Sequence, residues 1–227
     1  TFLRYTTNNQ REPSNSRRQQ SVFTEFISFQ LDTFLRYTTD EMASLWARYN
    51  ALLETQPLLT KALTSFTGFT VGDILAQSFI EPADKDYDYM RTARLGSFGF
   101  LIHGTTGHFF YGFLDSKMPG TAPTTVVTKV MIDQLLWNPI FGLMFFGYLN
   151  FTEGKSMDDY IAKLKADLQT AVMGSWAVWV PAHTINFRFV PPSQRLLYIN
   201  TIQIFYNVFL SFLGNKEVEG EEEKKEE

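Results

Sequence analysis

The sequence predicts an all-α fold, an integral membrane helical bundle with four to five spanning segments and an amphipathic helix near the N-terminus. Two observations support this prediction. Aromatic residues make up 16% of the 227 residues and include 22 Phe, whereas charged residues make up only 19%, below the roughly 25% of typical soluble domains. The charges also gather at the two ends and in a few loops, which leaves long uncharged stretches. Both features indicate contact with lipid.

Four stretches contain no Asp, Glu, Lys or Arg, and they cover residues 95–114, 134–152, 168–187 and 196–214. Each is about 20 residues long and would reach roughly 30 Å as a helix, the thickness of a hydrocarbon core. A fifth stretch, residues 62–80, contains only Asp73. The alternative is a soluble bundle of long buried helices. Such helices should show polar faces with charge pairs four residues apart, and these stretches offer none.

Small residues within the stretches favour close helix packing. Residues 95–114 contain Gly96, Gly99, Gly104, Gly107 and Gly112. Glycine is costly in a water-exposed helix, but in a bilayer it lets helices approach closely while Ser, Thr and His bond across the gap. No stretch is apolar enough to serve as a lone anchor. We therefore expect a compact bundle whose polar residues turn inward.

Caps and prolines predict where the elements begin. Asp40 can cap an amphipathic helix that runs to about Gln56, and Pro57 then begins the first span. One face of that helix carries Leu45, Trp46, Tyr49, Leu52 and Leu53. Trp and Tyr at such positions are typical of a membrane interface.

The later connections are read in the same way. Residues 81–89 form an acidic, turn-rich loop. Ser156 caps an amphipathic lead-in over residues 154–166, and Pro191 with Pro192 separates the last two spans.

Three regions follow from this pattern, namely a polar N-terminal arm (residues 1–40), the membrane bundle (41–214) and an acidic tail (215–227). The tail holds three Lys and seven Glu, so its composition predicts disorder and leaves the rest of the chain neutral. A neutral body argues against nucleic acid as a partner. The absence of Cys and the presence of only three His argue against thiolate or histidine metal sites. No catalytic residue, metal site or cofactor is predicted, because no nucleophile–base pair or phosphate-binding loop occurs.

One group of residues carries a family resemblance. The pattern W-x-x-W…N-F-x-x-V-P is formed by Trp176, Trp179, Asn186, Phe187, Val190 and Pro191. It resembles the signature of the Mpv-seventeen and twenty-two-kilodalton peroxisomal membrane protein family. Further spaced matches include Gly72-Asp73…Gln77, Asp88…Arg91…Arg94, Asp115…Pro119-Gly120, Lys129…Asp133-Gln134…Pro139 and Arg195…Asn207. The resemblance covers residues 42–213 and implies a small, helical, non-enzymatic membrane protein of the mitochondrial inner or peroxisomal membrane.

Four positions depart from the family pattern. These departures leave the predicted fold intact but weaken the argument for any pore property carried over from the family. Thr105 stands where the family has Pro, His183 where it has Gln, and Tyr206 where it has Trp. Pro181 is shifted by one position, since the family's Pro directly follows the second Trp.

Polar residues within or at the edge of the predicted spans should face the bundle interior and be paired. They are Asp73, His108, Asp133, Gln134 and Asn186. One interpretation is a polar pathway for small solutes. The other is a structural network in which Asp73 or Asp133 pairs with Arg91, Arg94 or Lys129.

Two further pairs have predicted roles. Trp176 and Trp179 are neighbours on a helix, and we expect them to pack or to anchor at the interface. Arg91 and Arg94 could bind lipid headgroups such as cardiolipin, although placement at the interface alone also accounts for them.

Two functions remain in competition. The favoured prediction is an accessory or structural subunit attached to a larger respiratory-type assembly of the mitochondrial inner membrane, with its arm and tail contacting other membrane-protein subunits. The reason is that both ends are polar and would need partners to order them. The alternative is a stand-alone, channel-like protein that passes small solutes. The Arg-rich N-terminal residues favour the mitochondrial inner membrane over the peroxisomal membrane.

Overall fold

The computed structural model describes residue 36 and residues 38–81 and 85–208. Helix is the only regular structure among these residues, in agreement with the predicted all-α class. The chain divides into two compact units, residues 1–51 and residues 52–227. In the first unit, residues 38–51 are helical, and the rings of Trp46 and Tyr49 stack with their centroids 5.8 Å apart. The predicted helix is therefore present, and Trp46 is half exposed on it. The predicted cap is wrong, because residues 38 and 39 are also helical and Asp40 lies within the helix.

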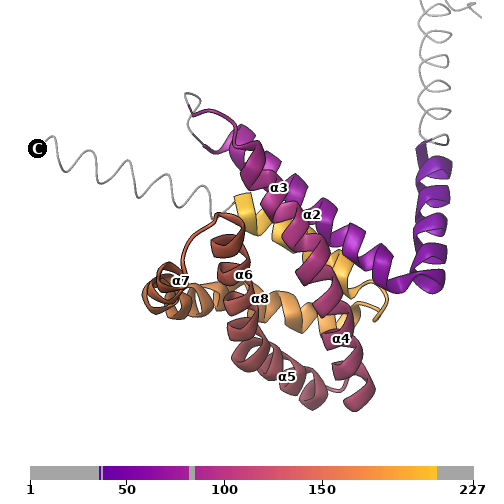
Figure 1. Ribbon diagram of the computed structural model, residues 1–227. Helices are drawn as coiled ribbons and strands as arrows, with labels where there is room; N and C mark the ends of the chain where they lie inside the picture. Colours follow the sequence, from indigo (N-terminus) through magenta and orange to yellow (C-terminus); the bar gives the residue numbers. More distant parts are fainter. Residues whose placement is uncertain (1–35, 37, 82–84, 209–227) are drawn as a thin grey trace, which may run out of the picture. The chain divides into compact units, whose positions relative to one another are not determined.

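The described part of the second unit contains five long helices (Figure 1). The first is α2 (Pro57–Phe79) and the last covers residues 195–208. The three between them are each made of consecutive segments: α3 (Tyr89–Phe98), η1 (Gly99–Gly104) and α4 (Thr105–Lys117); α5 (Pro123–Ile132), η2 (Asp133–Trp137) and α6 (Asn138–Thr152); and α7 (Met157–Lys163), η3 (Leu164–Leu168) and α8 (Gln169–Phe189). The η segments are short π-helical turns, so each of these three helices is interrupted but not broken.

Local side-chain chemistry sets the helix boundaries. The Asp88 carboxylate accepts a hydrogen bond from the Arg91 backbone N–H (2.8 Å) and caps α3. The predicted cap Ser156 forms a reciprocal capping box with Asp159 at the start of α7. Gly154, with φ at +70°, makes the tight turn that precedes it.

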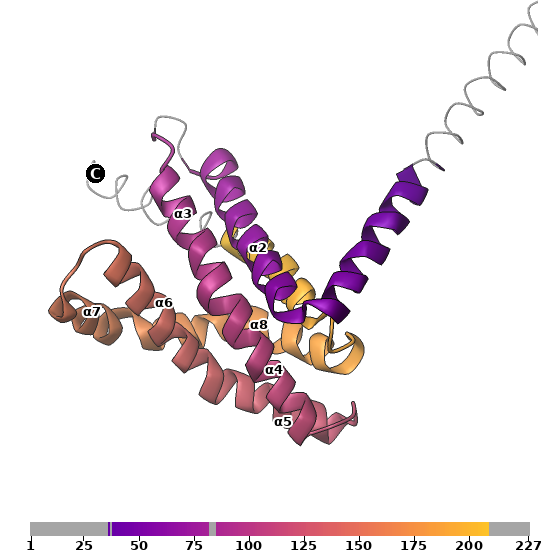
Figure 2. The ribbon, with the colours of Figure 1, turned by 45° about the vertical axis from the view of Figure 1, so that its right-hand side comes forward.

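Close approaches at glycine hold α2 against its neighbours. In both views α2 lies beside α3 (Figures 1 and 2). A Cβ atom placed on Gly104 would lie 2.5 Å from the Ala62 Cα atom of α2, closer than van der Waals contact allows. On the other side of α2, a Cβ on Gly68 would lie 2.8 Å from the Cβ of Asn200. Small residues therefore let three backbones approach closely, as in membrane helix pairs.

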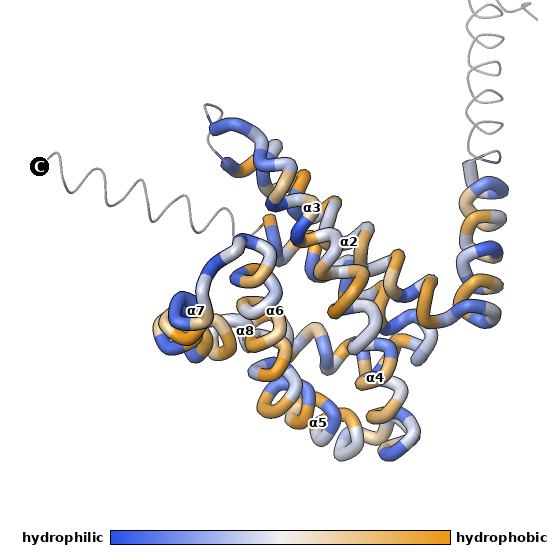
Figure 3. Tube along the Cα trace, in the orientation of Figure 1, coloured by the Kyte–Doolittle hydropathy of each residue, from blue (hydrophilic) through white to orange (hydrophobic). Residues whose placement is uncertain are grey.

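The distribution of polarity is inverted relative to a soluble protein. Among the described residues, twelve polar or charged side chains are buried, nearly as many as the thirteen buried hydrophobic ones. Large hydrophobic side chains such as Phe109 (65% exposed) and Leu136 (58%) point outward instead. Figure 3 shows hydrophobic residues interspersed with polar ones along the helices, and hydrophilic colour at α7 and at the described residues just before α3. This arrangement is typical of a bundle that faces lipid.

One helix among the described residues, Pro123–Thr152, is both long enough and apolar enough to be recognised as a membrane span by length and composition. The predicted count of four to five is not reached by this measure. The reason lies in composition, because α2 contains Lys61 and Asp73 and the other helices are rich in Gly, Ser, Thr, Tyr and Trp, which score low on hydropathy scales.

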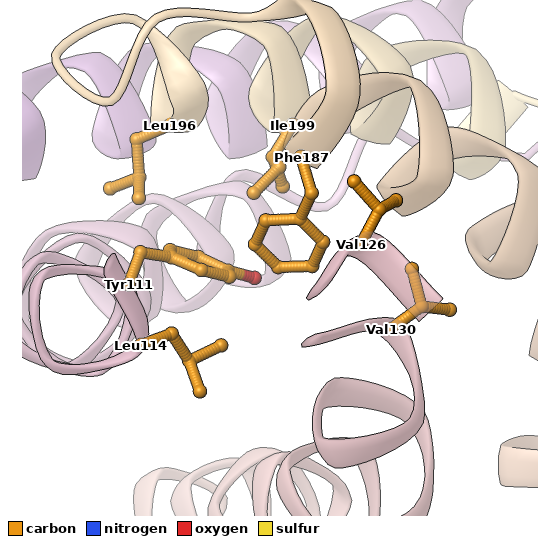
Figure 4. Packing of buried hydrophobic residues seen from close by; sticks show 7 residues of the cluster. All are labelled: Tyr111, Leu114, Val126, Val130, Phe187, Leu196 and Ile199. Atoms are coloured by element: carbon orange, nitrogen blue, oxygen red, sulfur yellow. The ribbon is translucent and has the colours of Figure 1, made fainter. Parts of the chain in front are cut away.

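A compact hydrophobic cluster occupies one end of the bundle, where α4, α5, α8 and residues 195–208 meet (Figure 4). Its buried members are Tyr111, Leu114, Val126, Val130, Phe187, Leu196 and Ile199. Phe187 and Leu114 are fully buried. Figure 4 shows the Tyr111 and Phe187 rings next to each other in the middle of the cluster, with the other five side chains around the two rings.

Candidate functional site

A cavity of about 630 Å³ lies inside the second unit, within the size range of small-molecule sites. All five long helices contribute to its wall. Aromatic side chains cover much of this wall, among them Phe69, Tyr111, Trp137, Phe141, Trp179 and Tyr206. Against this apolar background, a few polar side chains reach the cavity, and they fall into three groups.

The first group surrounds the Asp133 carboxylate. The Gln134 amide donates to its Oδ2 (2.7 Å), and the Tyr111 hydroxyl donates to its Oδ1 (3.3 Å). The His183 Nε2 atom lies 3.2 Å from the same Oδ2. Asp133 and His183 are 1% and 5% exposed. Donors from α4 and α8 thus converge with a neighbour on η2, so the carboxylate is held in one orientation.

The second group extends from this carboxylate along the cavity wall. The Asn138 amide donates to Gln134 Oε1 (3.3 Å) and to Ser175 Oγ (2.9 Å). The Ser175 hydroxyl in turn donates to the Val172 carbonyl (2.8 Å). Asn138 and Gln134 are four residues apart, so they lie on the same helix face. A row of amides and a hydroxyl therefore connects α6 to α8.

His103 forms the third group. Its Nδ1 lies 2.9 Å from the Ser65 hydroxyl, which also accepts a hydrogen bond from the Asn200 amide (3.0 Å). The imidazole packs between Phe69 and Phe141, with centroid distances of 5.1 and 5.6 Å. The ring is therefore fixed by three helices, and one face of the group borders the cavity.

The π-helical turns place these groups. His103 belongs to η1, and Asp133 and Gln134 belong to η2. An extra residue in a turn changes the direction of the side chains that follow and commonly occurs at functional sites. Two of the three π-helical turns thus carry buried polar residues into the cavity wall.

Charged residues form one end of the cavity, here called the mouth and defined by Asp73, Glu81, Lys85 and Arg91. The Arg91 Nε atom lies 2.8 Å from Asp73 Oδ1, and Arg91 also pairs with Glu81. Lys85 pairs with Glu81 at 2.5 Å. The Asp73–Arg91 pair agrees with the predicted structural network. Because Lys85 is exposed and Arg91 is 34% exposed, this end of the cavity reaches the surface.

Glu81 lies in the loop after α2, and its ionisation follows from its neighbours. Burial raises the pKa of this carboxyl, but hydrogen bonds from Lys85 and Arg91 and their positive charges outweigh that effect, so the net pKa lies below the ordinary value of 4.5. Glu81 is therefore ionised at neutral pH and holds the two cations of the mouth.

A second charged cluster lies at the other end of the bundle, outside the cavity wall. The Lys129 Nζ atom lies 2.7 Å from Asp115 Oδ1, and the Arg195 guanidinium pairs with the same oxygen. The alternative pairing of Lys129 with Asp133 is therefore wrong. The two residues are four apart on one helix, but a Lys side chain extended away from Asp133 reaches the α4 end, where Asp115 lies.

The residues predicted for a polar pathway separate into two sets. Asp73, Asp133 and Gln134 line the cavity. His108 and Asn186 do not, and Asn186 is fully buried with neither amide atom hydrogen-bonded within the described residues.

The position of His108 follows from the packing of α4. The buried residues of that helix are Gly107, Tyr111 and Leu114, which recur at the spacing of one helix face. His108 lies one residue beyond Gly107, is partly buried and is not part of the cavity wall.

The family-signature residues have distinct places. Trp179 lines the cavity, and its ring packs against His183 (5.5 Å) and Tyr206 (5.6 Å). A Cβ on Gly72 would lie 2.7 Å from the Asn207 amide nitrogen. The remaining positions are Trp176, half-buried on α8, and Pro191, exposed directly after it. Arg94, predicted to meet lipid headgroups, is half-buried and makes no ion pair among the described residues, whereas Arg91 is engaged at the mouth.

Sequence reasoning did not assign His103, His183, Tyr111 or Ser175 to the cavity. No local signal joins them, because their partners lie 22 to 50 residues away along the chain. The spacing of Gln134 and Asn138 was the one usable local signal, since it places both amides on one face.

Within the described parts of the chain, no group of three or more His, Asp or Glu side chains is arranged to hold a metal ion. The ionisable groups of the cavity instead bind one another. What the arrangement offers chemically is a set of hydrogen-bond donors and acceptors in an aromatic wall, with charged groups at the mouth.

Comparison with known proteins gives a consistent result. Residues 150–211 match the family model described as Mpv17 / PMP22 family. The chain is 32% identical to Peroxisomal membrane protein 2 of Bos taurus, over 74% of the chain and 88% of the bovine protein. It is 34% identical to Protein SYM1 of Saccharomyces cerevisiae (75% and 90%) and 30% identical to Mitochondrial inner membrane protein Mpv17 of Danio rerio (77% and 99%). No solved structure matches the chain.

Proposed function

The chain belongs to the Mpv17 / PMP22 family of membrane proteins, and on that premise we propose that it is a non-enzymatic, channel-like protein whose central cavity passes small polar solutes. Its relatives place it in the mitochondrial inner membrane, with the peroxisomal membrane as the alternative. The observation that carries the proposal is the buried Asp133 cluster on the cavity wall.

Ionisable groups inside a membrane bundle are costly and commonly mark a pathway for solutes or ions. Hydrophobic residues of similar size could fill the positions of Asp133 and His183, and such replacements of buried polar pairs often cost no stability. Their place on the wall of a cavity, rather than in a solid core, favours a role in solute contact. The aromatic walls limit the solute to one small enough to fit about 630 Å³.

Passage requires that the helices cross the bilayer, and we propose that four to five of them do. The α2 helix has 23 residues and would be about 35 Å long, enough for a hydrocarbon core of about 30 Å. The outward-facing Phe, Leu and Ile side chains support the same arrangement. Retention of the protein in carbonate-washed membranes tests it, and release into the supernatant would contradict it.

The function itself is tested by solute flux in liposomes containing the purified protein, with Asp133→Asn compared with wild type. The substitution replaces the carboxyl group by an amide of nearly the same shape, so we expect the flux of charged solutes to change several-fold while the flux of a small neutral solute changes less. Asp158→Asn is the matched control, because Asp158 is exposed on α7 and outside the cavity.

The accessory-subunit prediction concerns residues 1–40 and 215–227, nearly all of which lie outside the described residues. It remains a second proposal, and the same experiment separates the two. Wild-type liposomes with no flux above empty ones, together with a native complex far larger than a small oligomer in mild detergent, would favour the subunit. Flux that depends on Asp133 would favour the channel.

A further inference from the structure

The cavity is open at one end and closed at the other. At the mouth it reaches the exposed Lys85 and the partly exposed Arg91. At the other end the wall stops at Tyr111, Asp133 and His183. One helical turn beyond His183, the Phe187 ring fills the space between α4, α5, α8 and residues 195–208 (Figure 4).

Beneath Phe187 lies the cluster of Asp115, Lys129 and Arg195, here called the clasp. Lys129 and Arg195 are 1% and 3% exposed, and both bind the same Asp115 oxygen. Both cations also lie over the Phe187 ring, with Nζ 5.8 Å and the guanidinium carbon 5.0 Å from its centroid. Each cation therefore contacts the carboxylate and the aromatic ring together, so the clasp joins α4, α5 and residues 195–208 around the closed end.

The charge of the clasp is unbalanced. Two nearly inaccessible cations share one carboxylate, and the partly buried Lys61 of α2 lies near enough to Asp115 and Arg195 to interact with both charges. At least one positive charge is therefore without a counter-charge in the cluster. A buried pair already recovers little of its desolvation cost, and an extra buried cation adds to that cost. Opening this end would admit water and hydrate the cations, so their desolvation cost favours the open form. The attraction of both cations to the Asp115 carboxylate favours the closed form.

From this geometry we propose that Asp115, Lys129 and Arg195 form a gate that holds Phe187 over the closed end of the cavity, so that solute passes when the clasp opens. This inference rests on the proposed function, because a gate matters only if the cavity conducts. The Asp133–His183 pair lies on the same two helices as Lys129 and Phe187, one turn away, which places solute contact and closure on common elements.

The gate has its own readout, which does not depend on flux. The chain contains no Cys, so Ser175→Cys places a single thiol in the cavity wall. In liposomes with oriented protein, a membrane-impermeant thiol reagent should label it from the mouth side only. Adding Asp115→Asn should allow labelling from both sides and raise solute flux about tenfold, an ordinary size for a conformational bias.

Three variants separate a gate from a general loss of structure. Phe187→Ala removes the ring but leaves the clasp charges intact, and it should also open the cavity to both sides. Lys129→Met keeps Asp115 paired with Arg195 and leaves only the partly buried Lys61 as a surplus cation, so labelling should remain one-sided, whereas a simple loss of ion pairing would open the cavity. Arg188→Gln is the control, because Arg188 neighbours Phe187 but bonds to Thr121 outside the clasp.

The outcomes of the gate and of the proposed function can be told apart. Two-sided labelling of Asp115→Asn and Phe187→Ala without flux in any variant would support the gate and overturn solute passage. Flux in wild type that Asp115→Asn and Phe187→Ala leave unchanged, with one-sided labelling throughout, would overturn the gate and leave the proposed function standing.

Discussion

The two charged ends of the bundle use opposite electrostatic arrangements. At the mouth, the acids Asp73 and Glu81 balance the cations Arg91 and Lys85, and the cations are partly or fully in contact with water. At the clasp, two buried cations share one carboxylate. We expect a balanced network with exposed cations to cost little and to leave the cavity accessible. An unbalanced network with two buried cations should keep its end closed only while the carboxylate, itself 20% exposed, is in place. Charge balance and hydration, rather than the number of ion pairs, thus distinguish an open end from a closed one.

Removing one carboxylate from each end tests the difference between the two ends most clearly. Asp115→Asn leaves two buried cations without an anion, and we expect a loss of about 3 kcal/mol in the free energy of unfolding, as for a broken buried pair. Asp73→Asn leaves Arg91 paired with Glu81, and the new amide oxygen still accepts from Gln77 and Thr92. Its cost should be about 1 kcal/mol.

Thermal denaturation of both variants in the same detergent measures this difference, with Asp158→Asn as an exposed control. Equal losses at the two ends would show that the surplus cation of the clasp has no energetic consequence. A larger loss for Asp73→Asn would reverse the comparison.

The next prediction concerns the close contact between Gly104 and α2, which fixes how α2 packs against the neighbouring helix. Gly104→Leu drives a side chain into the Ala62 backbone of α2, so α2 must shift relative to both the mouth and the clasp. We expect a loss of about 1–3 kcal/mol or more, as for an overpacked core, and reduced accumulation in the membrane. Gly112→Leu is the matched control on the same helix, because nothing lies within 4 Å of a Cβ placed there. Equal accumulation of the two variants would rule out a packing role for Gly104.

Much of the fold could be predicted from the sequence, because charge-free stretches, Pro57 and the Ser156 cap are local signals. Each of the five predicted stretches falls largely within one helix, but two of the helices begin 11 residues earlier, at Pro123 and Met157. The mouth was partly predictable as well, since Asp73 and Arg91 were natural candidates for pairing. The π-helical turns were not, because the extra residue only rotates the face that follows, and these helices have no sharp polar face on which such a rotation could be recognised in the sequence.

The clasp and the Asp133–His183 pair could not be predicted for a different reason. Asp115, Lys129 and Arg195 are separated by 14 to 80 residues, and one sequence does not say which cation meets which carboxylate. Lys129 shows the difficulty, since its neighbour four residues along, Asp133, was the plausible partner and the wrong one. Only tertiary packing decides such pairings.

The smallest expected effect tests how far the mouth depends on ionisation. The folded-state pKa of Glu81 lies below 4.5, with burial opposing the shift and Lys85 and Arg91 driving it. A carboxyl whose pKa is depressed by folding stabilises the protein fully above its unfolded pKa, and this contribution is lost as the pH falls through the lower folded pKa. Wild type should therefore lose more stability than Glu81→Gln as the pH falls below about 4.5, by up to about 1 kcal/mol because the pair is near the surface. Melting temperatures of the two proteins between neutral and acidic pH measure this difference.

Because Glu81→Gln weakens only the mouth, labelling of a cavity thiol should remain one-sided at every pH. Parallel pH profiles for the two proteins would mean that Glu81 does not hold the mouth cations, and two-sided labelling would mean that the two ends are not independent.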